Sequence, residues 1–468
     1  MNKITFGTDG WRSMMAEDFT FHNVKIVAQA IAHFINEEKL GDRGIVIGFD
    51  NRFLSPEFAK ACSNVLTANK IRVYITENAA PTPVIAFEVV NLKAAGAIMI
   101  TASHNPPMYN GIKFIPEYGG PAHKGITDKI VENVKMILES GEINERSNEE
   151  WVRLSEPKEA YIAAVSKLID GDVITKAKLK IVYNPMFGAG IGYTSEILES
   201  LGCTVKTINN YRDPLFGGSM PEPTIANMKD LVKAMDKEGA DLGLATDGDA
   251  DRFGVIDSKG NYISPNQVIY LLQHYLIKTR GWKGTVARTV ATTYMVDRIA
   301  EKYGMEVIET PVGFKYIADA MINRDAFLGG EESGGLSIRG HVPEKDGILA
   351  CLLIAEMVAR YGKSPTEIME DLKEEVGYLY SKRLDIHCTN VVKERVLNHL
   401  KEYNPENIAG KKIEKVISID GQKFVMEDGS WMLIRASGTE ALFRIYAEGN
   451  SMEQVDQIQA QVRQDLKL

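Results

Sequence analysis

The sequence predicts an α/β protein with three related α/β domains and a smaller C-terminal α+β domain. Three segments share one pattern, in which an apolar strand, a loop and a helical stretch lead to a second apolar strand. The two strands of each segment begin 20 to 26 residues apart, a spacing typical of βαβ units. After Gly377 the sequence changes to short strands and charged helices, which is typical of an α+β domain.

The three repeated segments give the expected order of elements along the chain. Their paired strands are expected at residues 45–49 and 71–75, 180–183 and 204–208, and 285–290 and 305–309. Three copies of one supersecondary unit predict three domains of similar architecture. Charged or polar stretches at residues 144–159 and 257–261 are candidate joints. We therefore expect domains over residues 1–150, 151–256, 257–375 and 376–468.

The composition favours a soluble metabolic enzyme. Of 468 residues, 44% are hydrophobic and 25% are charged, which is enough to bury several cores. The 54 basic and 63 acidic residues give a net charge of −9, which argues against general nucleic-acid binding. The four cysteines show no CxxC spacing, so a reducing cytoplasm is the expected compartment. The N-terminus lacks an apolar signal core, and Glu356 interrupts the most apolar late run, so no membrane span is expected.

The most informative segment is TASHNPPMYNGIKF, residues 101–114, which follows a short apolar strand over residues 94–100. Ser103 lies where that strand ends and a run of turn-forming residues begins. Open α/β sheets bind ligands at the carboxyl ends of their strands, so the Ser103 hydroxyl is a candidate reactive group. The alternative is that this serine only caps a turn. Lys113, ten residues further on, favours a loop that handles phosphate.

Asp247, Asp249 and Asp251 alternate in the segment TDGDADRF, which follows an apolar run. On an extended backbone alternate side chains point the same way about 6.7 Å apart, and each carboxylate pair repels by about 2.5 kcal/mol. A cation relieves this repulsion. The calcium helix-loop-helix pattern needs Gly at its sixth position and Glu at its twelfth, and this loop has neither. Three oxygen ligands with room for a phosphate favour Mg²⁺, with a solvated acidic turn as the alternative.

The segment GGEESGG, residues 329–335, places Glu331, Glu332 and Ser333 between glycine pairs. Glycines let the backbone and a carboxylate approach a polyol closely. Because acidic glycine-rich turns are also common on surfaces, this segment alone is weak evidence for a sugar site.

The segment RASGTE, residues 435–440, precedes an alternating strand over residues 442–447. Arg435 supplies a fork of donors, and the hydroxyls and free amides that follow it suit a terminal phosphate. A plain surface turn is the alternative.

Together, and in this order, the four loops resemble those of the α-D-phosphohexomutase superfamily, which includes phosphoglucomutases, phosphomannomutases and their glucosamine relatives. The resemblance begins at FGTDGWR, residues 6–12, which is similar to the family's opening loop, and it ends at RASGTE. Agreement of several ordered loops is far more specific than agreement of one motif. The resemblance implies three α/β domains with mixed sheets plus a C-terminal α+β domain, arranged around a central cleft that receives one loop from each domain.

The resemblance also implies a role for each matched residue. Ser103 would be the phosphoserine that donates and recovers the phosphoryl group, and it would hold Mg²⁺ together with Asp247, Asp249 and Asp251. Glu331 and Ser333 would bind the sugar hydroxyls. The remaining matches are Arg435, Ser437, Gly438 and Thr439, which would bind the phosphate that is not reacting, and Arg12, His104, Lys113 and Arg252 around the reaction centre.

The implied reaction interconverts a hexose 1-phosphate and a hexose 6-phosphate. Phospho-Ser103 would give its phosphoryl group to the sugar, and the resulting 1,6-bisphosphate would turn over and return its other phosphate to the serine. The expected ligands are hexose phosphates, Mg²⁺ and glucose 1,6-bisphosphate as activator and intermediate. We expect a monomer or a homodimer that binds neither nucleic acid nor a membrane. A phosphoserine phosphatase would not need the distal phosphate clamp, and a non-catalytic sensor would be expected to lack Ser103 or an aspartate.

This chain differs from the dual-specificity members of the superfamily at positions that bear on which sugar it prefers. Those members resemble GEMSGH in the third loop, whereas this chain has Gly335 at the position of the histidine. The segments HVPEKDG and TPVGFKY are nearer to phosphoglucomutases, so His341 and Lys315 are candidate substrate ligands and glucose is the expected sugar. Lys345 is the candidate replacement for the missing imidazole as acid or base. The alternatives are that Lys345 only binds phosphate, that His341 is a surface residue, and that mannose or glucosamine is preferred.

Overall fold

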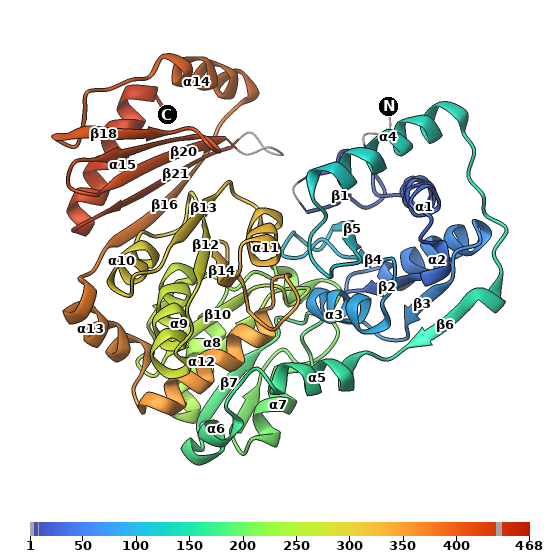
Figure 1. The fold of residues 1–468 in the computed structure, drawn as a ribbon, viewed down its shortest axis with the longest axis horizontal. Helices are drawn as coiled ribbons and strands as arrows, with labels where there is room; N and C mark the ends of the chain where they lie inside the picture. Colours follow the sequence, from blue (N-terminus) through green and yellow to red (C-terminus); the bar gives the residue numbers. More distant parts are fainter. Residues whose placement is uncertain (1–3, 8, 437–441) are drawn as a thin grey trace.

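The chain folds into four units, each built on a β-sheet (Figure 1). The computed structural model describes residues 4–7, 9–436 and 442–468. In Figure 1 the first unit lies on the right, the second and third lie below, and the fourth lies at the upper left. The first three sheets mix parallel and antiparallel strands, and the fourth is antiparallel throughout the described residues.

The first unit has a six-stranded sheet in the order β1-β5-β4-β2-β3-β6. Alternate side chains of β2 explain its layers, because Ile45 and Ile47 pack with α1, α2 and α4 whereas Val46 packs with α3 on the other face. The strands are β1 Trp11–Met14, β2 Ile45–Phe49, β3 Val73–Thr76, β4 Gly96–Ile100, β5 Tyr109–Pro116 and β6 Val152–Ser155. The helices are α1 Phe21–Glu37, α2 Ser55–Ala68, α3 Thr82–Leu92 and α4 Lys124–Ser140.

The second unit has a five-stranded sheet in the order β11-β10-β9-β7-β8. Val182 of β7 packs with α8, and its neighbours Ile181 and Tyr183 face the core that this unit shares with the third. The strands are β7 Lys180–Asn184, β8 Thr204–Thr207, β9 Leu242–Thr246, β10 Phe253–Asp257 and β11 Tyr262–Ile263. The helices are α5 Lys158–Ser166, α6 Gly171–Ala177, α7 Thr194–Ser200 and α8 Lys229–Glu238.

The third unit has a four-stranded sheet in the order β13-β12-β14-β15. Ser264 and Ser364 begin α9 and α13 with capping boxes, and a proline follows each serine at a position where the helix needs no backbone N–H. The strands are β12 Thr285–Thr289, β13 Val307–Thr310, β14 Ala326–Glu331 and β15 Gly335–Ile338. The helices are α9 Pro265–Arg280, α10 Met295–Lys302, α11 Phe314–Asn323, α12 Gly347–Tyr361 and α13 Pro365–Val376.

The fourth unit has a six-stranded sheet in the order β16-β21-β20-β19-β18-β17. One face, with Phe424 and Ile445, packs under α14 and α15, and the other face, with Trp431 and Leu433, packs on Val290 of the third unit. The strands are β16 Tyr380–His387, β17 Asn407–Ile408, β18 Lys411–Ile417, β19 Gln422–Met426, β20 Trp431–Ala436 and β21 Leu442–Gly449. The helices are α14 Asn390–Glu402 and α15 Met452–Leu466.

The three predicted βαβ units are confirmed. The strand pairs β2 and β3, β7 and β8, and β12 and β13 are each parallel and each joined through a helix. In each of these three units a further parallel strand pairs with the first strand of the βαβ unit. A hairpin then adds an antiparallel strand, and the three hairpins are β4–β5, β9–β10 and β14–β15. These three hairpins carry the first three predicted functional loops, which therefore occupy equivalent positions in the three units.

The first two sheets continue past the predicted domain limits at residues 150 and 256. Strand β6 pairs with β3 in the first sheet, and β11 pairs with β10 in the second. Each short strand lies in or directly after a polar stretch, so its weak apolar signal does not mark it as part of the preceding sheet. In the described part of the chain, none of the helices combines the length and apolarity that a bilayer span requires.

Candidate active site

The β4–β5 hairpin holds Ser103 in a constrained position. Ser103 is buried and has a φ of 50°, a left-handed conformation that is uncommon for a residue with a side chain. Its backbone N–H donates to Thr101 Oγ1 at 2.8 Å, and its carbonyl accepts from Arg52 at 2.6 Å. The Ser103 hydroxyl consequently reaches the second unit, where it donates to Asp247 Oδ2 at 2.8 Å.

Arg52 is a supporting residue that no sequence motif indicates. Its guanidinium is buried and donates to the carbonyls of Ser103, Asn105, Pro106 and Tyr109. Four carbonyls of one loop thus share a single buried cation. This arrangement fixes the backbone shape of the serine loop, because charge-assisted hydrogen bonds are stronger than neutral ones.

The three aspartates lie in the hairpin loop between β9 and β10. The expected extended geometry is wrong: Ala250 has a φ of 57°, and the chain turns back so that Phe253 pairs with Thr246. The turn nevertheless directs the carboxylates toward one point. One oxygen from each of Asp247, Asp249 and Asp251 lies within 4.8 Å of the others, and all three side chains are fully buried.

This aspartate loop has the properties of a cation site. Asp249 Oδ1 and Asp251 Oδ1 are buried and accept no hydrogen bond from the residues that the structure describes. Burial and the neighbouring Asp249 and Asp251 raise the pKa of Asp247 well above its usual range. A divalent cation would occupy the two unused oxygens and relieve the repulsion among the carboxylates. Because Mg²⁺ prefers oxygen ligands, the residues present fit a magnesium ion.

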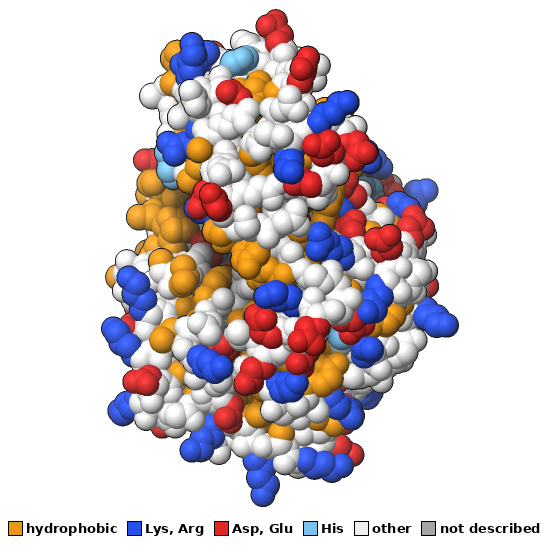
Figure 2. Space-filling model, turned by 90° about the vertical axis from the view of Figure 1, so that its left-hand side faces the viewer, with side chains coloured by type: hydrophobic (Ala, Val, Ile, Leu, Met, Phe, Trp, Pro, Cys, Tyr) orange, Lys and Arg blue, Asp and Glu red, His pale blue; other side chains and the backbone are white. Residues whose placement is uncertain are grey.

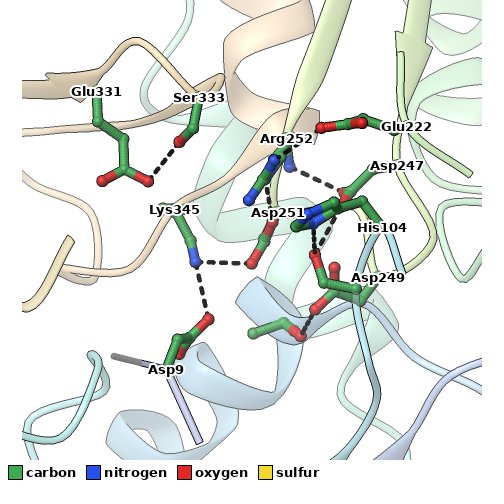
Figure 3. A network of polar contacts seen from close by, with 12 residues as sticks. Asp9, His104, Glu222, Asp247, Asp249, Asp251, Arg252, Glu331, Ser333 and Lys345 are labelled. Carbon is green, nitrogen blue, oxygen red and sulfur yellow. Dashed lines mark hydrogen bonds and ion pairs between the residues drawn. The ribbon is translucent and has the colours of Figure 1, made fainter. Parts of the chain in front are cut away.

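Two lysines bring positive charge to this loop from the first and third units. Lys113 Nζ on β5 lies 2.9 Å from Asp249 Oδ2 and 2.9 Å from Asp251 Oδ2, and Lys345 Nζ lies 2.8 Å from Asp251 Oδ2. Both ammonium groups also contact Asp9 Oδ2, Lys113 at 3.1 Å and Lys345 at 3.2 Å. Figure 3 shows the contacts of Lys345 with Asp9 and Asp251. Although burial disfavours the charged form, these carboxylates raise the pKa of both lysines. Both lysines therefore remain cations at neutral pH.

His104 lies beside the serine hydroxyl as a neutral imidazole. Its Nδ1 is 3.3 Å from Ser103 Oγ. Burial, together with the nearby cations Arg252 and Arg12, lowers the pKa of His104 well below its usual value. A neutral imidazole at this distance is able to accept the serine proton.

Two arginines border the same centre. Arg252 donates its backbone N–H to Asp247 Oδ1 at 3.0 Å, and its side chain pairs with Glu222 at 3.2 Å. Arg12 donates to Asn105 Oδ1 at 3.0 Å and so touches the serine loop from β1. The structure thus brings together the residues predicted at the reaction centre, and it adds Asp9 and Glu222 to them (Figure 3).

The β14–β15 hairpin presents Glu331 and Ser333. Ser333 Oγ donates to Glu331 Oε1 at 2.6 Å, whereas Glu331 Oε2 is buried and accepts no hydrogen bond from the described residues. Burial raises the pKa of Glu331. Glu332, between them, contacts Thr289 at 2.9 Å and Tyr446 at 3.3 Å, so it links the third unit to the fourth. In Glu331, the buried Oε2 is therefore available to accept a hydrogen bond from a ligand hydroxyl.

Gly335 makes room for Lys345. A Cβ atom on Gly335 would lie 2.4 Å from Lys345 Cδ and 2.6 Å from its Cγ, which is too close for any real contact. The lysine stem therefore occupies the space next to residue 335. Because the lysine stem fills the space that a side chain at position 335 would need, the position of Lys345 depends on a glycine at 335.

Replacing Gly335 with alanine should lower the free energy of unfolding by about 1 to 3 kcal/mol, because the added methyl group must push the lysine stem out of its packed position. Gly7→Ala is the matched control, since a Cβ there would meet its nearest atom at 3.6 Å. Chemical denaturation of both variants measures the difference. Equal stability of the two variants would contradict the packing argument.

His341 is buried close to Lys345 and contacts Asp346, the next residue after that lysine. Its side chain is 2% exposed, and its Nε2 lies 2.8 Å from Asp346 Oδ2, so the alternative of a surface residue is wrong. The same Asp346 oxygen accepts from Tyr161 at 2.6 Å, and the other Asp346 oxygen caps α12. These contacts anchor the backbone next to Lys345. A direct contact of His341 with substrate stays a prediction.

Lys315 lies in the first turn of α11. Burial and the charge of Lys124, at the start of α4, lower the pKa of Lys315, so this lysine is within electrostatic range of the first unit. Its Nζ also lies 5.2 Å from the ring centre of Tyr316. Neither of these two interactions connects Lys315 to the aspartate loop.

Arg435 is the penultimate residue of strand β20 in the fourth unit. Its Nε donates to Asp420 Oδ2 at 2.8 Å. Arg444 on β21 is directly opposite Arg435, and its buried Nε has no hydrogen-bond partner among the described residues. Two arginine residues therefore face each other on neighbouring strands, a feature that RASGTE alone does not indicate. Three predicted phosphate ligands lie outside the described residues: Ser437, Gly438 and Thr439.

A pocket of about 400 Å³ lies between the fourth unit and the second and third units. Arg252 and Ser333 contribute to its wall from one side, and Arg383, Trp431 and Tyr446 contribute from the fourth unit. Figure 2 shows one face of the molecule, with hydrophobic side chains around a hollow and with basic and acidic groups interspersed over the surface. Because the two signs of charge are interspersed on that face, any preference of the pocket for an anion would come from local groups such as the arginines.

Profiles of four protein families match consecutive parts of the chain. Residues 3–140, 159–260 and 264–376 match the phosphoglucomutase/phosphomannomutase alpha/beta/alpha domains I, II and III, and residues 395–465 match the C-terminal domain of the same proteins.

Known proteins match almost the whole chain. A phosphoglucomutase/phosphomannomutase of Thermococcus kodakarensis is 31% identical, over 97% of this chain and 96% of its own. A probable phosphoglucosamine mutase of Methanosphaera stadtmanae is also 31% identical, over 97% and 96%. The crystal structure of a putative phosphomannomutase from Thermus thermophilus is 33% identical, covers 100% of both chains and superposes with a TM-score of 0.86. Because the four profiles and these relatives agree along the chain, it belongs to the phosphoglucomutase/phosphomannomutase family of α-D-phosphohexomutases, enzymes that transfer a phosphoryl group intramolecularly.

Proposed function

We propose that this phosphohexomutase interconverts glucose 1-phosphate and glucose 6-phosphate through phospho-Ser103 and a 1,6-bisphosphate. One observation carries the proposal: the Ser103 hydroxyl, on a constrained loop of the first unit, meets the aspartate loop of the second unit at 2.8 Å. A serine displayed against a cation site and two buried lysines has the charge environment that phosphoryl transfer requires.

The groups around Ser103 divide the work between proton transfer and charge neutralisation. Return of the phosphoryl group requires removal of the serine proton, and neutral His104 at 3.3 Å is positioned to accept it. Lys345, whose pKa is raised, stays charged and therefore stabilises phosphoryl oxygens instead of acting as a base. The pKa of Lys113 is also raised, and we assign it the same electrostatic role.

Asp247, Asp249 and Asp251 would hold Mg²⁺, which when bound neutralises the charge that develops on the transferring phosphoryl group. Glu331 and Ser333 would orient the sugar through its hydroxyls. The fourth unit would bind the phosphate that is not reacting through Arg435 together with Ser437, Gly438 and Thr439, and Arg444 supports this assignment by adding a second guanidinium. Lys315 and His341 remain proposed substrate ligands.

The preference for glucose is tested with a panel of sugars. Glucose and mannose differ only at C2, whereas Glu331 and Ser333, by family resemblance, would bind the hydroxyls at C3 and C4. Galactose 1-phosphate should lose about 5- to 150-fold in kcat/KM, because its inverted C4 hydroxyl leaves a buried partner unpaired at a cost of about 1 to 3 kcal/mol. Mannose 1-phosphate should be weaker than glucose 1-phosphate but measurable, and glucosamine 1-phosphate should be poor.

Each sugar is supplied with a trace of its own 1,6-bisphosphate, and kcat/KM is compared across the panel. A preference for mannose or glucosamine would overturn the sugar assignment and leave the mutase mechanism standing. Release of free phosphate in place of a 6-phosphate would indicate a phosphatase, and absence of both products would indicate a sensor.

A further inference from the structure

Asp420 connects the fourth unit to the third through a single carboxylate oxygen. Its Oδ2 accepts from Arg435 Nε at 2.8 Å and from the backbone N–H of Val312 at 3.1 Å. Val312 lies between β13 and α11, in the segment that carries Lys315 in the first turn of the helix. One acidic group therefore contacts two parts of the site that come from different units.

The turn that holds Asp420 is built for this position. Gly421, next in the chain, has a φ of 85°, and a Cβ there would lie 2.4 Å from the carbonyl oxygen of Ile434. The turn is therefore pressed against β20, one residue before Arg435. The negative charge of Asp420 also lies near the amino end of α11, where the partial positive charge of the helix favours it.

A second contact from the same hairpin fixes its docking. Lys423, three residues after Asp420, is fully buried, and its Nζ donates to the carbonyl of Val290 at 2.9 Å and lies 3.1 Å from Glu309 Oε1. The same ammonium group lies 4.0 Å from the ring centres of both Tyr294 and Trp431. The β18–β19 hairpin is thus docked on the segments that follow β12 and β13.

We propose that Asp420 is a positioning residue that orients the Arg435 guanidinium for the distal phosphate. The inference rests on the proposed function, in which Arg435 holds the phosphate that is not reacting. Asp420 binds the guanidinium at Nε, a contact that does not use the two terminal nitrogens, and these nitrogens form the fork that matches two phosphate oxygens. Through the same oxygen, Asp420 also holds the guanidinium at a fixed position relative to the segment that carries Lys315.

The test is a double-mutant cycle with Asp420→Ala and Arg435→Ala. Asp420→Ala should raise both KM and the Kd for glucose 1-phosphate by about 10-fold, because a charge-assisted hydrogen bond orients the arginine, while kcat should change by less than about threefold. In the Arg435→Ala background the same change should have no further effect on Kd, because its effect passes through the arginine. Glu414→Ala, an exposed acid on the same hairpin, is the control and should keep the wild-type values.

A merely structural role for Asp420 would give a different result. The variant would then lose active protein, which lowers the apparent kcat and the melting temperature but leaves KM and Kd unchanged. An unchanged Kd for Asp420→Ala, or a full additional effect in the Arg435→Ala background, would overturn the inference. Because Kd is measured by calorimetry without turnover, failure to form 6-phosphate would count against the proposed function alone.

Discussion

Replacing Ser103 with alanine should lower kcat by at least about 10⁴-fold, because a double-displacement reaction has no route without its covalent carrier. Alanine meets the same left-handed backbone strain as serine at this position, so the fold should survive the change. Turnover of glucose 1-phosphate at saturating Mg²⁺, measured by coupled detection of glucose 6-phosphate, gives the ratio of kcat values. Ser63→Ala, at another buried serine on α2, is the matched control and should retain normal turnover.

The same assignment is tested on the protein itself. Intact mass and peptide mapping of the purified protein should find a single phosphoryl group on Ser103 in part of the molecules. Phosphate found only on other residues, with Ser103→Ala still active, would rule out this serine as the carrier.

Removal of divalent metal should abolish turnover, and Mg²⁺ should restore it. Of the three buried aspartates, Asp249 and Asp251 pair with lysines that also contact Asp9, and one oxygen of each accepts no hydrogen bond from the described residues. Asp249→Asn should weaken Mg²⁺ binding by about 10-fold or more, because one anionic ligand is lost while the shape of the side chain is kept. Titration of the apoprotein with Mg²⁺, followed by calorimetry and by kcat, measures both effects.

Asp241→Asn provides the matched control for the metal experiment, because Asp241 directly precedes β9 but lies outside the aspartate loop. This variant should bind Mg²⁺ as the wild type does. Full activity in excess chelator would be incompatible with the magnesium site.

The parts of the fold that the sequence predicts are those governed by local patterns. Residues 45–49, 180–183 and 285–290 are apolar runs bounded by turn signals, and all three begin parallel strand pairs as expected. The serine and aspartate loops are recognisable because each directly follows an apolar run, whereas the glutamate loop is marked only by its glycine pairs and by the family resemblance. The short strands β6 and β11 were not, because two to four residues carry too little periodicity.

The residues that sequence reasoning misses act across large separations in the chain. Arg52 supports the carbonyl of Ser103 from 51 residues away, and Asp9, also missed, contacts the predicted Lys345 across 336 residues. Asp420 carries no motif, and its contact with Val312 depends on how the fourth unit docks. The extended geometry expected for the aspartates failed because the left-handed Ala250 allows a tight turn that alternation alone does not reveal.

The cluster of Asp9, Lys113, Asp251 and Lys345 has a consequence for how such a chain diverges. Lys113, Asp251 and Lys345 are buried, Asp9 is partly exposed, and the four come from three units; loss of one partner of the buried groups leaves another uncompensated at a cost of about 3 to 5 kcal/mol. If one of these units were replaced by the corresponding unit of another protein that lacks these residues, the product would carry an uncompensated buried charge. We therefore expect the first three units to be inherited together, with these positions changing only in concert; the fourth has its own core, but its buried Lys423 pairs with Glu309 of the third unit, so those two positions should also change together.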